Sequence, residues 1–424
     1  MKIAFIDLGN ELSSFFSSLT HDHAKDMNFV FFSSKPKPIS ILKKNKVKIY
    51  KCKKIRFLQD LSFDDIKRNI NPKVFIEYKD DKKLKVDALY FYRNLKLFFN
   101  DEKPDAVMVW NGSGLASSLA CSLAKEVGAI CIYGENGYFP GTMQLDNQGV
   151  NDNASINKNT EELLKNFTPN IKQTEIFTEI LNRYLNDDNT LNQKIENPTK
   201  PSFLSRIEDL TRRKVKTKNK SIMPNQLILK NIDEWPINYV FMPLQVHGDS
   251  QLIIHSPVYG QDLDNFVKDT ASALNSIDPS LKLIVKLHPK DDRCYDQLSQ
   301  TLSNAIFVKN ISAKKLIHFS KVVITINSTV GFEALLFNKP VVTAGSNFYI
   351  GHEFTFDVNQ RSELTNQLRL ALSSDEAPIG TQNFCHFIYQ EYLTHGNPKN
   401  FSEESKLAVS KKLRLIANQK DHLS

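Results

Sequence analysis

The feature that most constrains this chain is an alternation of short apolar runs with helical segments, which occurs in both halves. In the second half the apolar runs are YVFMPLQV, LKLIVKLHP, AIFVK, VVITINS and KPVVTAG. A strand followed by a helix and a further strand forms a βαβ unit, in which the two strands are parallel. Four such units within about 110 residues predict a Rossmann-like domain.

A second alternation opens the chain. KIAFID precedes a helical segment and NFVFFSS, and PDAVMVWNG precedes the helical GLASSLACSLAKEVG and the strand AICIYGENG. Gly128 stands where a glycine commonly ends a helix. The first half therefore predicts a parallel sheet of its own.

The region between these alternations has a different composition. Asn, Lys, Thr and Asp dominate it, and TEELLKNFTPNIKQTEIFTEILNRYLND has a helical pattern with charges on one side. We predict an α/β protein with GT-B-like architecture, in which two Rossmann-like domains with parallel sheets face each other across a cleft. The predicted segments are a first domain at 1–155, a helical insertion or linker at 156–235, a second domain at 236–360 and helices at 361–424 that pack back on the domains.

The overall composition is that of a soluble globular protein. The 424 residues are 41% hydrophobic and 24% charged, and a chain of this length predicts two domains. No stretch approaches the roughly 20 apolar residues of a membrane span, and MKIAFIDLGN predicts a first strand rather than a signal peptide. The five cysteines, unevenly spaced and without CxxC, argue against a disulfide framework or zinc site and favour the cytosol.

The net charge of +8 is concentrated in two basic runs, at 35–56 and 211–220. Such runs are either solvated faces and loops or surfaces that attract an anionic partner. The chain has no nucleic-acid-binding motif and no basic face with interleaved aromatic residues. An anionic membrane surface or substrate is therefore favoured over nucleic acid.

Four polar clusters follow predicted strands. They are Glu135 in GENGYFPGT, 245–249 in QVHGD, His288 in KLHP, and 328–329 in INSTVGFEA. Ligands of open parallel sheets bind at the carboxyl ends of the strands, so these clusters are candidates for one site.

The cluster at Ser328 and Thr329 lies between a strand and a helix, with Gly331 in the first helical turn. Free backbone N–H groups, two hydroxyls and the helix dipole predict an anion site there. Glu333, one turn further on, could reach a ribose hydroxyl. The alternative is simple capping, with Ser328 or Thr329 as the N-cap.

His288 is flanked by Lys286 and Lys290 and is followed by Pro289. An imidazole beside two ammonium groups can bind a phosphate oxygen. The alternative is a histidine packed at a strand end beside a turn-forming proline. Two anion-binding elements in one domain favour a nucleotide-sugar phosphate over a dinucleotide.

Asp249 and Glu135 are carboxylates that follow strands of different domains. A carboxylate from each domain in one cleft suits glycosyl transfer, where one acts on the anomeric carbon and the other handles a proton. The alternatives are a turn residue for Asp249 and an exposed loop carboxylate for Glu135. Since no Asp-x-Asp motif follows a strand, the sequence does not require a catalytic metal.

Four blocks of the chain together resemble the KpsS/KpsC-type capsule polysaccharide proteins, which are retaining β-Kdo glycosyltransferases. The blocks are YGENGYFPGTMQLDNQGVN, PLQVHGDS, KLHP and NSTVGFEALLFNKPVVTAGSNFY, in the family's order. The single-module length is most similar to the KpsS-like members.

The resemblance implies CMP-Kdo as the donor, Asp249 as the nucleophile and Glu135 as a candidate base on the acceptor side. It implies a donor site at Gln245, Lys286, His288, Pro289, Ser328, Thr329, Gly331 and Glu333, and acceptor-side positions at Asn136 and Tyr138. His288, Ser328 and Thr329 would hold the CMP phosphate, and no cofactor or metal is expected.

The resemblance also implies a glycolipid or polysaccharide acceptor, contact with other capsule-assembly proteins, and a cytoplasmic location peripheral to the inner face of the inner membrane. Two alternatives remain open. One is the same fold acting on another CMP- or UDP-sugar. The other is a non-catalytic capsule export or scaffold protein.

Overall fold

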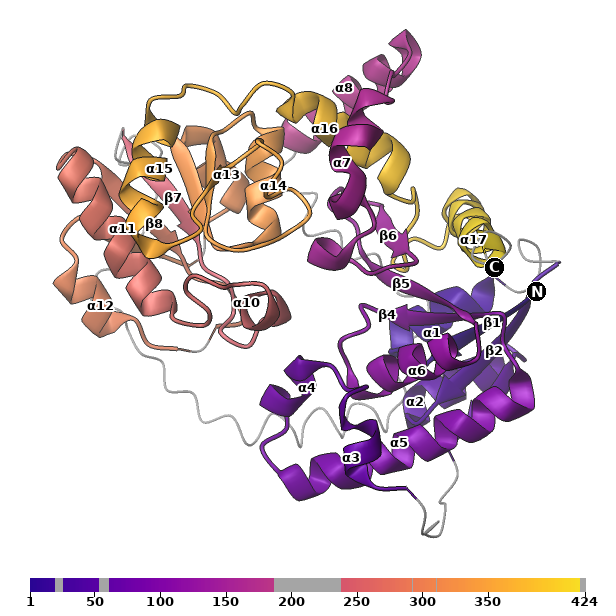
Figure 1. Cartoon of the computed structure of the whole chain (residues 1–424). Coiled ribbons are helices and arrows are strands. Elements are labelled where there is room, and N and C mark those ends of the chain that lie inside the picture. The colour runs from indigo at the N-terminus through magenta and orange to yellow at the C-terminus, as the bar shows by residue number, and fades with distance from the viewer. Residues whose placement is uncertain (20–25, 53–60, 187–237, 292, 310, 420–424) are drawn as a thin grey trace.

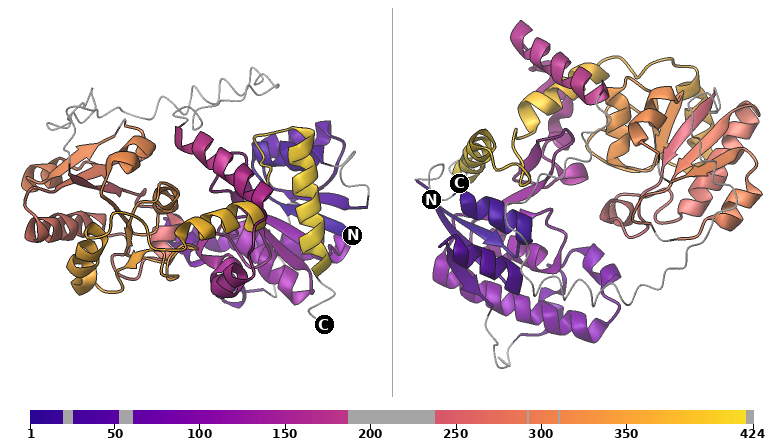
Figure 2. Two further views of the ribbon diagram at one scale, coloured as in Figure 1. Left: turned by 90° about the horizontal axis from the view of Figure 1, so that it is seen from above. Right: turned by 180° about the vertical axis from the view of Figure 1, so that it is seen from behind.

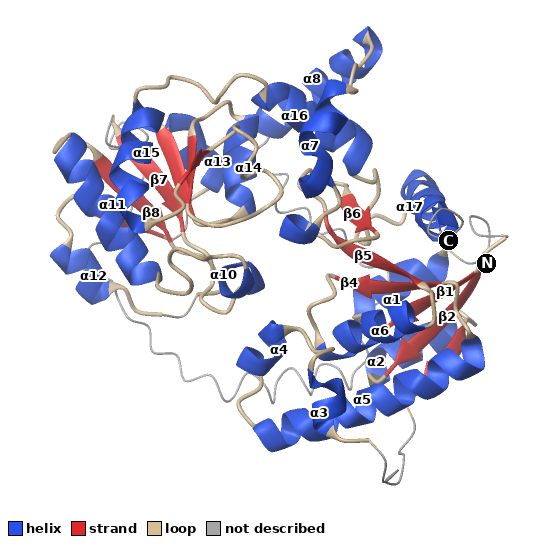
Figure 3. Ribbon diagram, in the orientation of Figure 1, coloured by secondary structure: helices blue, strands red, loops and turns tan. Residues whose placement is uncertain are grey.

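The computed structural model describes residues 1–19, 26–52, 61–186, 238–291, 293–309 and 311–419. Within them the chain forms two α/β domains, each built on a six-stranded sheet (Figure 1). Helices cover both sheets (Figure 3). The basic run at 211–220 and the end of the run at 35–56 lie outside the described residues.

The first sheet has the strand order β3-β2-β1-β4-β5-β6. Its strands are β1 Lys2–Ile6, β2 Asn28–Ser33, β3 Lys48–Lys51, β4 Ala106–Trp110, β5 Ile130–Asn136 and β6 Met143–Asp146. The helices between them are α1 Asn10–Ser18, α2 Pro36–Lys44, α3 Phe63–Lys67, α4 Pro72–Glu77, α5 Asp81–Glu102 and α6 Leu115–Glu126. All pairs are parallel except β5 and β6, which are antiparallel with Glu135 opposite Gln144.

The second sheet has the strand order β12-β11-β10-β7-β8-β9, with every pair parallel. Its strands are β7 Tyr239–Pro243, β8 Lys282–Lys286, β9 Ala305–Val308, β10 Val322–Thr325, β11 Val341–Thr343 and β12 Phe356–Asp357. Its helices are α10 Ser250–Ile254, α11 Leu263–Ile277, α12 Asp296–Thr301, α13 Ala313–Phe319, α14 Thr329–Leu336 and α15 Leu364–Leu372.

The central strands of both sheets are buried because helices cover both of their faces. All four residues of β10, the sequence VVIT, are buried, as continuous β-branched runs in parallel sheets usually are. The GT-B-like fold class predicted from the two alternations is confirmed.

The segment after β6 packs on the second domain. It contains a short 3-10 turn Asn151–Asn153, then α7 Ile156–Lys165 and α8 Ile171–Asn186. Phe177 and Tyr184 of α8 belong to one apolar cluster with Phe332 of α14. These helices therefore cover the second domain's core.

The last part of the chain returns to the first domain (Figure 2). The 3-10 turn Arg361–Glu363 and α15 lie against α11, and the helical segments Thr381–Phe387 (α16) and Ile388–Tyr392 (a π-helical turn) join the α7–α8 side. The final helix α17, Glu403–Ala417, packs on β5 and β6.

Candidate functional site

Two adjoining hollows lie at the carboxyl ends of the strands. The first hollow, of about 220 Å³, lies where β7, β8 and β10 end. Its wall includes Gln245, Asp249, Lys286, His288, Ser328 and Thr329. The structure thus brings together six of the residues singled out from three separate strand ends.

The second hollow, of about 370 Å³, lies between the domains. The first domain contributes Glu135, Asn136 and Tyr138 to its wall, and the second contributes Asp249, Thr329 and Glu333. Four residues line both hollows, namely Asn151, Asp249, Gln251 and Thr329. Asp249 therefore stands where the two hollows meet.

Asp249 is held by the start of α10. Its Oδ1 accepts a hydrogen bond from the backbone N–H of Gln251 at 2.9 Å, so Asp249 is the N-cap of this helix. Its Oδ2 accepts a longer bond, 3.4 Å, from Nε2 of Gln245. A carboxylate oxygen accepts more than one hydrogen bond, so Oδ2 keeps capacity toward the hollows. Asp249 thus caps α10, a role that the sequence interpretation as a turn residue did not include and that does not exclude a chemical role.

Asn327 ties the strand-end loops together, and it was not singled out from the sequence. It is 1% exposed, and its Oδ1 accepts from Nε2 of Gln245 at 3.0 Å. Its Nδ2 donates to the carbonyl oxygens of Gln251 and His255 at 3.0 and 2.9 Å. Because buried amides of this kind hold their partners in one arrangement, Asn327 positions the loop that carries Asp249. Its place directly before Ser328 was an available signal.

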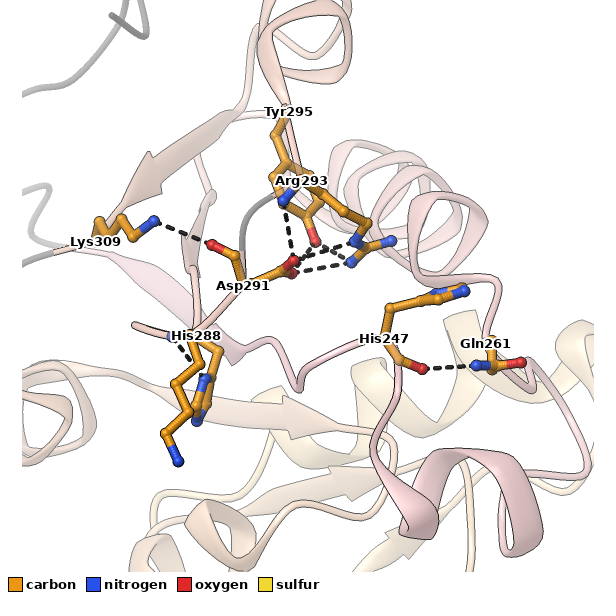
Figure 4. Close-up of polar contacts among 8 residues, drawn as sticks. His247, Gln261, His288, Asp291, Arg293, Tyr295 and Lys309 are labelled. Carbon is orange, nitrogen blue, oxygen red and sulfur yellow. Dashed lines mark hydrogen bonds and ion pairs between the residues drawn. The ribbon is translucent and has the colours of Figure 1, made fainter. Parts of the chain in front are cut away.

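His288 lines the first hollow, and one of its ring nitrogens already accepts a hydrogen bond from the backbone. The backbone N–H of Lys290 lies 3.1 Å from Nδ1, which must accept (Figure 4). In the neutral ring the proton is then on Nε2, which can donate to a ligand. Burial lowers the pKa of His288, and the ammonium groups of Lys286 and Lys290 lower it further. Burial also lowers the pKa of Lys286.

The turn that carries His288 is fixed by Asp291 (Figure 4). The backbone N–H of Asp291 donates to the carbonyl oxygen of His288 at 3.0 Å. The carboxylate of Asp291 accepts from the hydroxyl of Tyr295 at 2.7 Å and from Nη2 of Arg293 at 3.2 Å. Lys309 donates to the carbonyl oxygen of Asp291 at 3.2 Å. This network holds the His–Pro turn in one conformation.

At the start of α14, one residue caps the helix and the next has hydrogen-bond donors that are available to a ligand. The hydroxyl of Ser328 accepts from the N–H of Val330 at 3.2 Å, so Ser328 is the N-cap, as its alternative interpretation predicted. The N–H of Gly331 donates to the carbonyl oxygen of Ser328 at 2.9 Å. In the described residues, no hydrogen bond is recorded for the hydroxyl or the N–H of Thr329. A Cβ at Gly331 would lie 2.3 Å from the hydroxyl of Tyr349, so this glycine allows close packing.

Pro289 and Gly331 do not line either hollow.

Glu333 lines the second hollow and meets Tyr184, a residue of α8 for which the sequence offered no signal. Burial raises the pKa of Glu333, while a hydrogen bond from the Tyr184 hydroxyl and the charges of Lys314 and Lys286 oppose the rise. The ammonium of Lys314 lies 3.7 Å from the ring centre of Tyr184, and this cation–π contact holds the Tyr184 ring in place.

Glu135 is oriented by two amides. Its Oε1 accepts from the backbone N–H and the Nδ2 of Asn136 at 2.8 and 3.0 Å, and its Oε2 accepts from Nδ2 of Asn111 at 3.4 Å. Burial raises the pKa of Glu135 against these hydrogen bonds. A carboxylate with a raised pKa and a fixed orientation can serve as a general base.

A close contact between an imidazole and a carboxylate joins the two domains beside the second hollow. Nδ1 of His255, which follows α10, lies 2.7 Å from Oδ2 of Asp152 in the loop after β6. The neighbouring Asn153 places its Nδ2 3.4 Å from Nε2 of the same ring. His255 and Asp152 were not singled out from the sequence.

Two features are absent from the residues that the structure describes. No group of three or more His, Cys, Asp or Glu side chains there could hold a metal ion. No helix there combines the length and apolar character needed to cross a bilayer.

Comparison of the sequence with protein families gives a match over more than half of the chain. The sequence model described as capsule polysaccharide biosynthesis protein matches residues 105–374. Protein FixF of Sinorhizobium fredii is 26% identical over 295 residues, which cover 69% of this chain and 60% of FixF. The capsule polysaccharide export protein KpsS of Escherichia coli is 28% identical over 144 residues, which cover 32% of this chain and 35% of KpsS. The matched part of this chain thus spans less than two thirds of either relative.

Solved structures give more distant likenesses. The β-Kdo 2,7 transferase of Thermosulfurimonas dismutans KpsC has a TM-score of 0.37 at 14% identity, covering 85% of this chain and 99% of that one. The β-Kdo 2,4 transferase of the same KpsC has a TM-score of 0.39 at 17% identity, covering 67% and 88%. A co-structure of S. aureus MnaA with UDP has a TM-score of 0.37 at 12% identity, covering 100% and 96%.

Proposed function

Because this chain belongs to the capsule polysaccharide biosynthesis protein family, we propose that it is a retaining glycosyltransferase that moves Kdo from CMP-Kdo to a glycolipid or glycan acceptor. The observation that carries the proposal is the position of Asp249, a carboxylate in the wall of both hollows. A nucleophile of this kind must reach the donor's anomeric carbon. It must also leave room for the acceptor on the opposite face of that carbon.

The first hollow is suited to the CMP phosphate. Nε2 of His288 and the hydroxyl and N–H of Thr329 are available donors, and the ammonium of Lys286 adds positive charge. The start of α14 contributes the positive end of its dipole. Hydrogen bonds to a charged phosphate are stronger than those between neutral groups. These groups would stabilise CMP as it leaves.

In the first step, an oxygen of Asp249 forms a bond to the anomeric carbon of Kdo. The bond between that carbon and the phosphate oxygen breaks, and CMP leaves with the electron pair. In the second step, an acceptor hydroxyl attacks the same carbon, its proton passes to Glu135, and the bond to Asp249 breaks to restore the carboxylate. Two inversions at one carbon give net retention.

Surface charge supports the proposed location. The described part of the basic run, α2 and β3, carries lysines on the surface of the first domain, among them Lys37, Lys43 and Lys51. Such a surface would favour an anionic leaflet at the inner face of the inner membrane. Contact with other capsule-assembly proteins is proposed from the family membership, not from the charge.

The test is mass spectrometry of the intact protein after incubation with CMP-Kdo without acceptor. We expect a covalent adduct of one Kdo residue, with release of CMP, and loss of both in Asp249→Asn. CMP-sialic acid and a UDP-sugar serve as alternative donors. Release of CMP without any adduct would remove Asp249 as nucleophile, and adducts formed only from another donor would replace Kdo.

A further inference from the structure

A third hollow, of about 420 Å³, lies in the first domain beside the second hollow. The two hollows share four wall residues, Asn71, Asn111, Val150 and Asn153. A ligand that fills the second hollow therefore has a further recess directly next to it, on the side away from the donor.

One face of α6 forms a wall of the third hollow. Ser118, Ser122 and Lys125 lie at intervals of three and four residues, which places them in a row along the helix. The two serines are small, which leaves room for a ligand, and their hydroxyls are hydrogen-bonding groups. The opposite wall is the link between α3 and α4, which contributes Arg68 and Asn69.

The third hollow carries two cations, Arg68 and Lys125, that form no direct ion pair within the described part of the chain, although the carboxylate of Asp65 acts on Arg68 at longer range. Arg68 and Lys125 are both exposed, and neither has an ion pair or hydrogen bond recorded among the described residues. Two other lysines of the first domain are paired, since Lys2 and Lys48 lie 3.4 and 2.8 Å from the carboxylate of Glu102. The charges of Arg68 and Lys125 are thus available to an anionic group of a ligand.

The second hollow has a different character. Its first-domain wall carries the amides of Asn71, Asn111 and Asn136 and the hydroxyl of Ser113, and no lysine or arginine of the described residues lines it. Amides and hydroxyls bind sugar hydroxyls, whereas a phosphate or carboxylate needs positive charge or several N–H donors. Val150 and Ile254 are its only aliphatic wall residues in the described part of the chain, which gives an acyl chain little to pack on.

We propose that the acceptor is an acidic saccharide of at least two units, whose reacting unit fills the second hollow and whose next unit places an anionic group, a carboxylate or phosphate, between Arg68 and Lys125. This subsite proposal rests on one part of the proposed function, namely that the acceptor binds in the second hollow. The third hollow is then an acceptor subsite that selects for charge at a distance from the reacting hydroxyl.

The experiment measures binding rather than turnover, by titration calorimetry in the presence of CMP. The probes are a disaccharide containing a hexuronic acid, the same disaccharide with its carboxyl group reduced to an alcohol, and the reduced form carrying a phosphate in its place. We expect the two anionic probes to bind about tenfold more tightly than the reduced one, the order of magnitude for two partly exposed charge contacts. The preference should shrink as salt is raised.

The double variant Arg68→Gln/Lys125→Gln should lose this preference and bind the reduced probe as the wild type does. The matched control is Lys268→Gln/Arg369→Gln, which removes two exposed charges from α11 and α15 on the second domain and should keep the preference. The ratio between the anionic probes identifies the preferred group.

If the wild type bound all three probes with equal affinity, the proposed subsite would be excluded. An equal loss of affinity for all three probes in the double variant would exclude it as well. So would failure of every saccharide to bind while a short-chain anionic phospholipid binds through the same two residues. The donor adduct at Asp249 does not depend on the acceptor, so loss of the proposed function and loss of the subsite give separate results.

Discussion

The ring of Tyr138 lies flat on the ring of Phe348, with centroids 3.9 Å apart and planes inclined by 11°. Tyr138 follows β5 of the first domain and Phe348 follows β11 of the second, so this stack joins the domains. The hydroxyl of Tyr138, which has one proton to share, also lies 2.9 Å from the acceptor Oε1 of Gln144 and 3.2 Å from the acceptor Oδ1 of Asn151. The stack thus fixes Asn151, which lines both hollows.

Two substitutions of Tyr138 should separate the contribution of its stacked ring from that of its hydroxyl group. Tyr138→Ala removes the stacked ring and should lower the free energy of unfolding by about 3 kcal/mol, as for other large aromatic truncations. Tyr138→Phe keeps the ring, and loss of the hydroxyl hydrogen bonds should cost about 1 kcal/mol. Chemical denaturation measures both. If the two variants were equally destabilised, the stack would contribute nothing to the contact between domains.

Replacement of Asp249 should stop transfer without weakening CMP binding. Asp249→Asn keeps an oxygen that can cap α10, whereas Asp249→Ala loses the cap and should cost about 1 kcal/mol in stability. Neither can form the glycosyl ester. Because the lost carboxylate repels phosphate, CMP should bind each variant at least as tightly as the wild type. Calorimetry with CMP and a transfer assay test this, and retained transfer in Asp249→Asn would contradict it.

His288→Ala should weaken CMP binding. The variant loses the Nε2 donor to a charged phosphate, a hydrogen bond worth about 1.5–3 kcal/mol, which corresponds to roughly a 10- to 100-fold rise in Kd. The matched control is His318→Ala on α13, an exposed histidine outside both hollows. An unchanged Kd in His288→Ala, or an equal change in the control, would exclude the phosphate contact.

Glu135 predicts the pH dependence of the second step. A general base must be ionised, and burial raises the pKa of Glu135. The rate of transfer should therefore increase with pH, with a midpoint above the ordinary glutamate pKa of about 4.3. Glu135→Gln should lose this rise and be slower by about 10² to 10⁴. The Kdo adduct forms before the base acts, so it should still appear in this variant. An adduct missing from Glu135→Gln would place Glu135 in the first step.

Tyr184→Phe should act on the donor site through Glu333. The Tyr184 hydroxyl lowers the pKa of Glu333, so its loss should raise that pKa further. Between the wild-type and variant pKa values, Glu333 is then ionised only in the wild type, so the variant has one negative charge fewer beside Lys286 and the donor site. Because a neutral Glu333 no longer repels phosphate, CMP affinity measured across pH should rise by about threefold in that window and match the wild type at higher pH. A loss of equal size at every pH would indicate a purely structural role.

The fold followed from patterns that are local in the sequence. Apolar runs such as VVIT and KIAFI are buried by the helices that follow them, so each strand and its helix are specified together. Parallel strands end at one edge, and for that reason His288, Asp249 and Ser328 were expected in one site before any distance was known. The resemblance to the KpsS/KpsC-type proteins rested on the same blocks and is confirmed by the family match and the KpsS relative.

The sequence by itself determined the two parallel sheets and which loops gather at their edges, because both depend on spacing along the chain. Only the tertiary structure decided which side chains meet across elements. Tyr184 reaches Glu333 from a helix some 150 residues away in a charged segment, and His255 meets Asp152 across the domain boundary. Such pairs depend on how the helices and domains pack, and that packing is set by apolar faces such as that of α8 rather than by any motif that contains the paired residues.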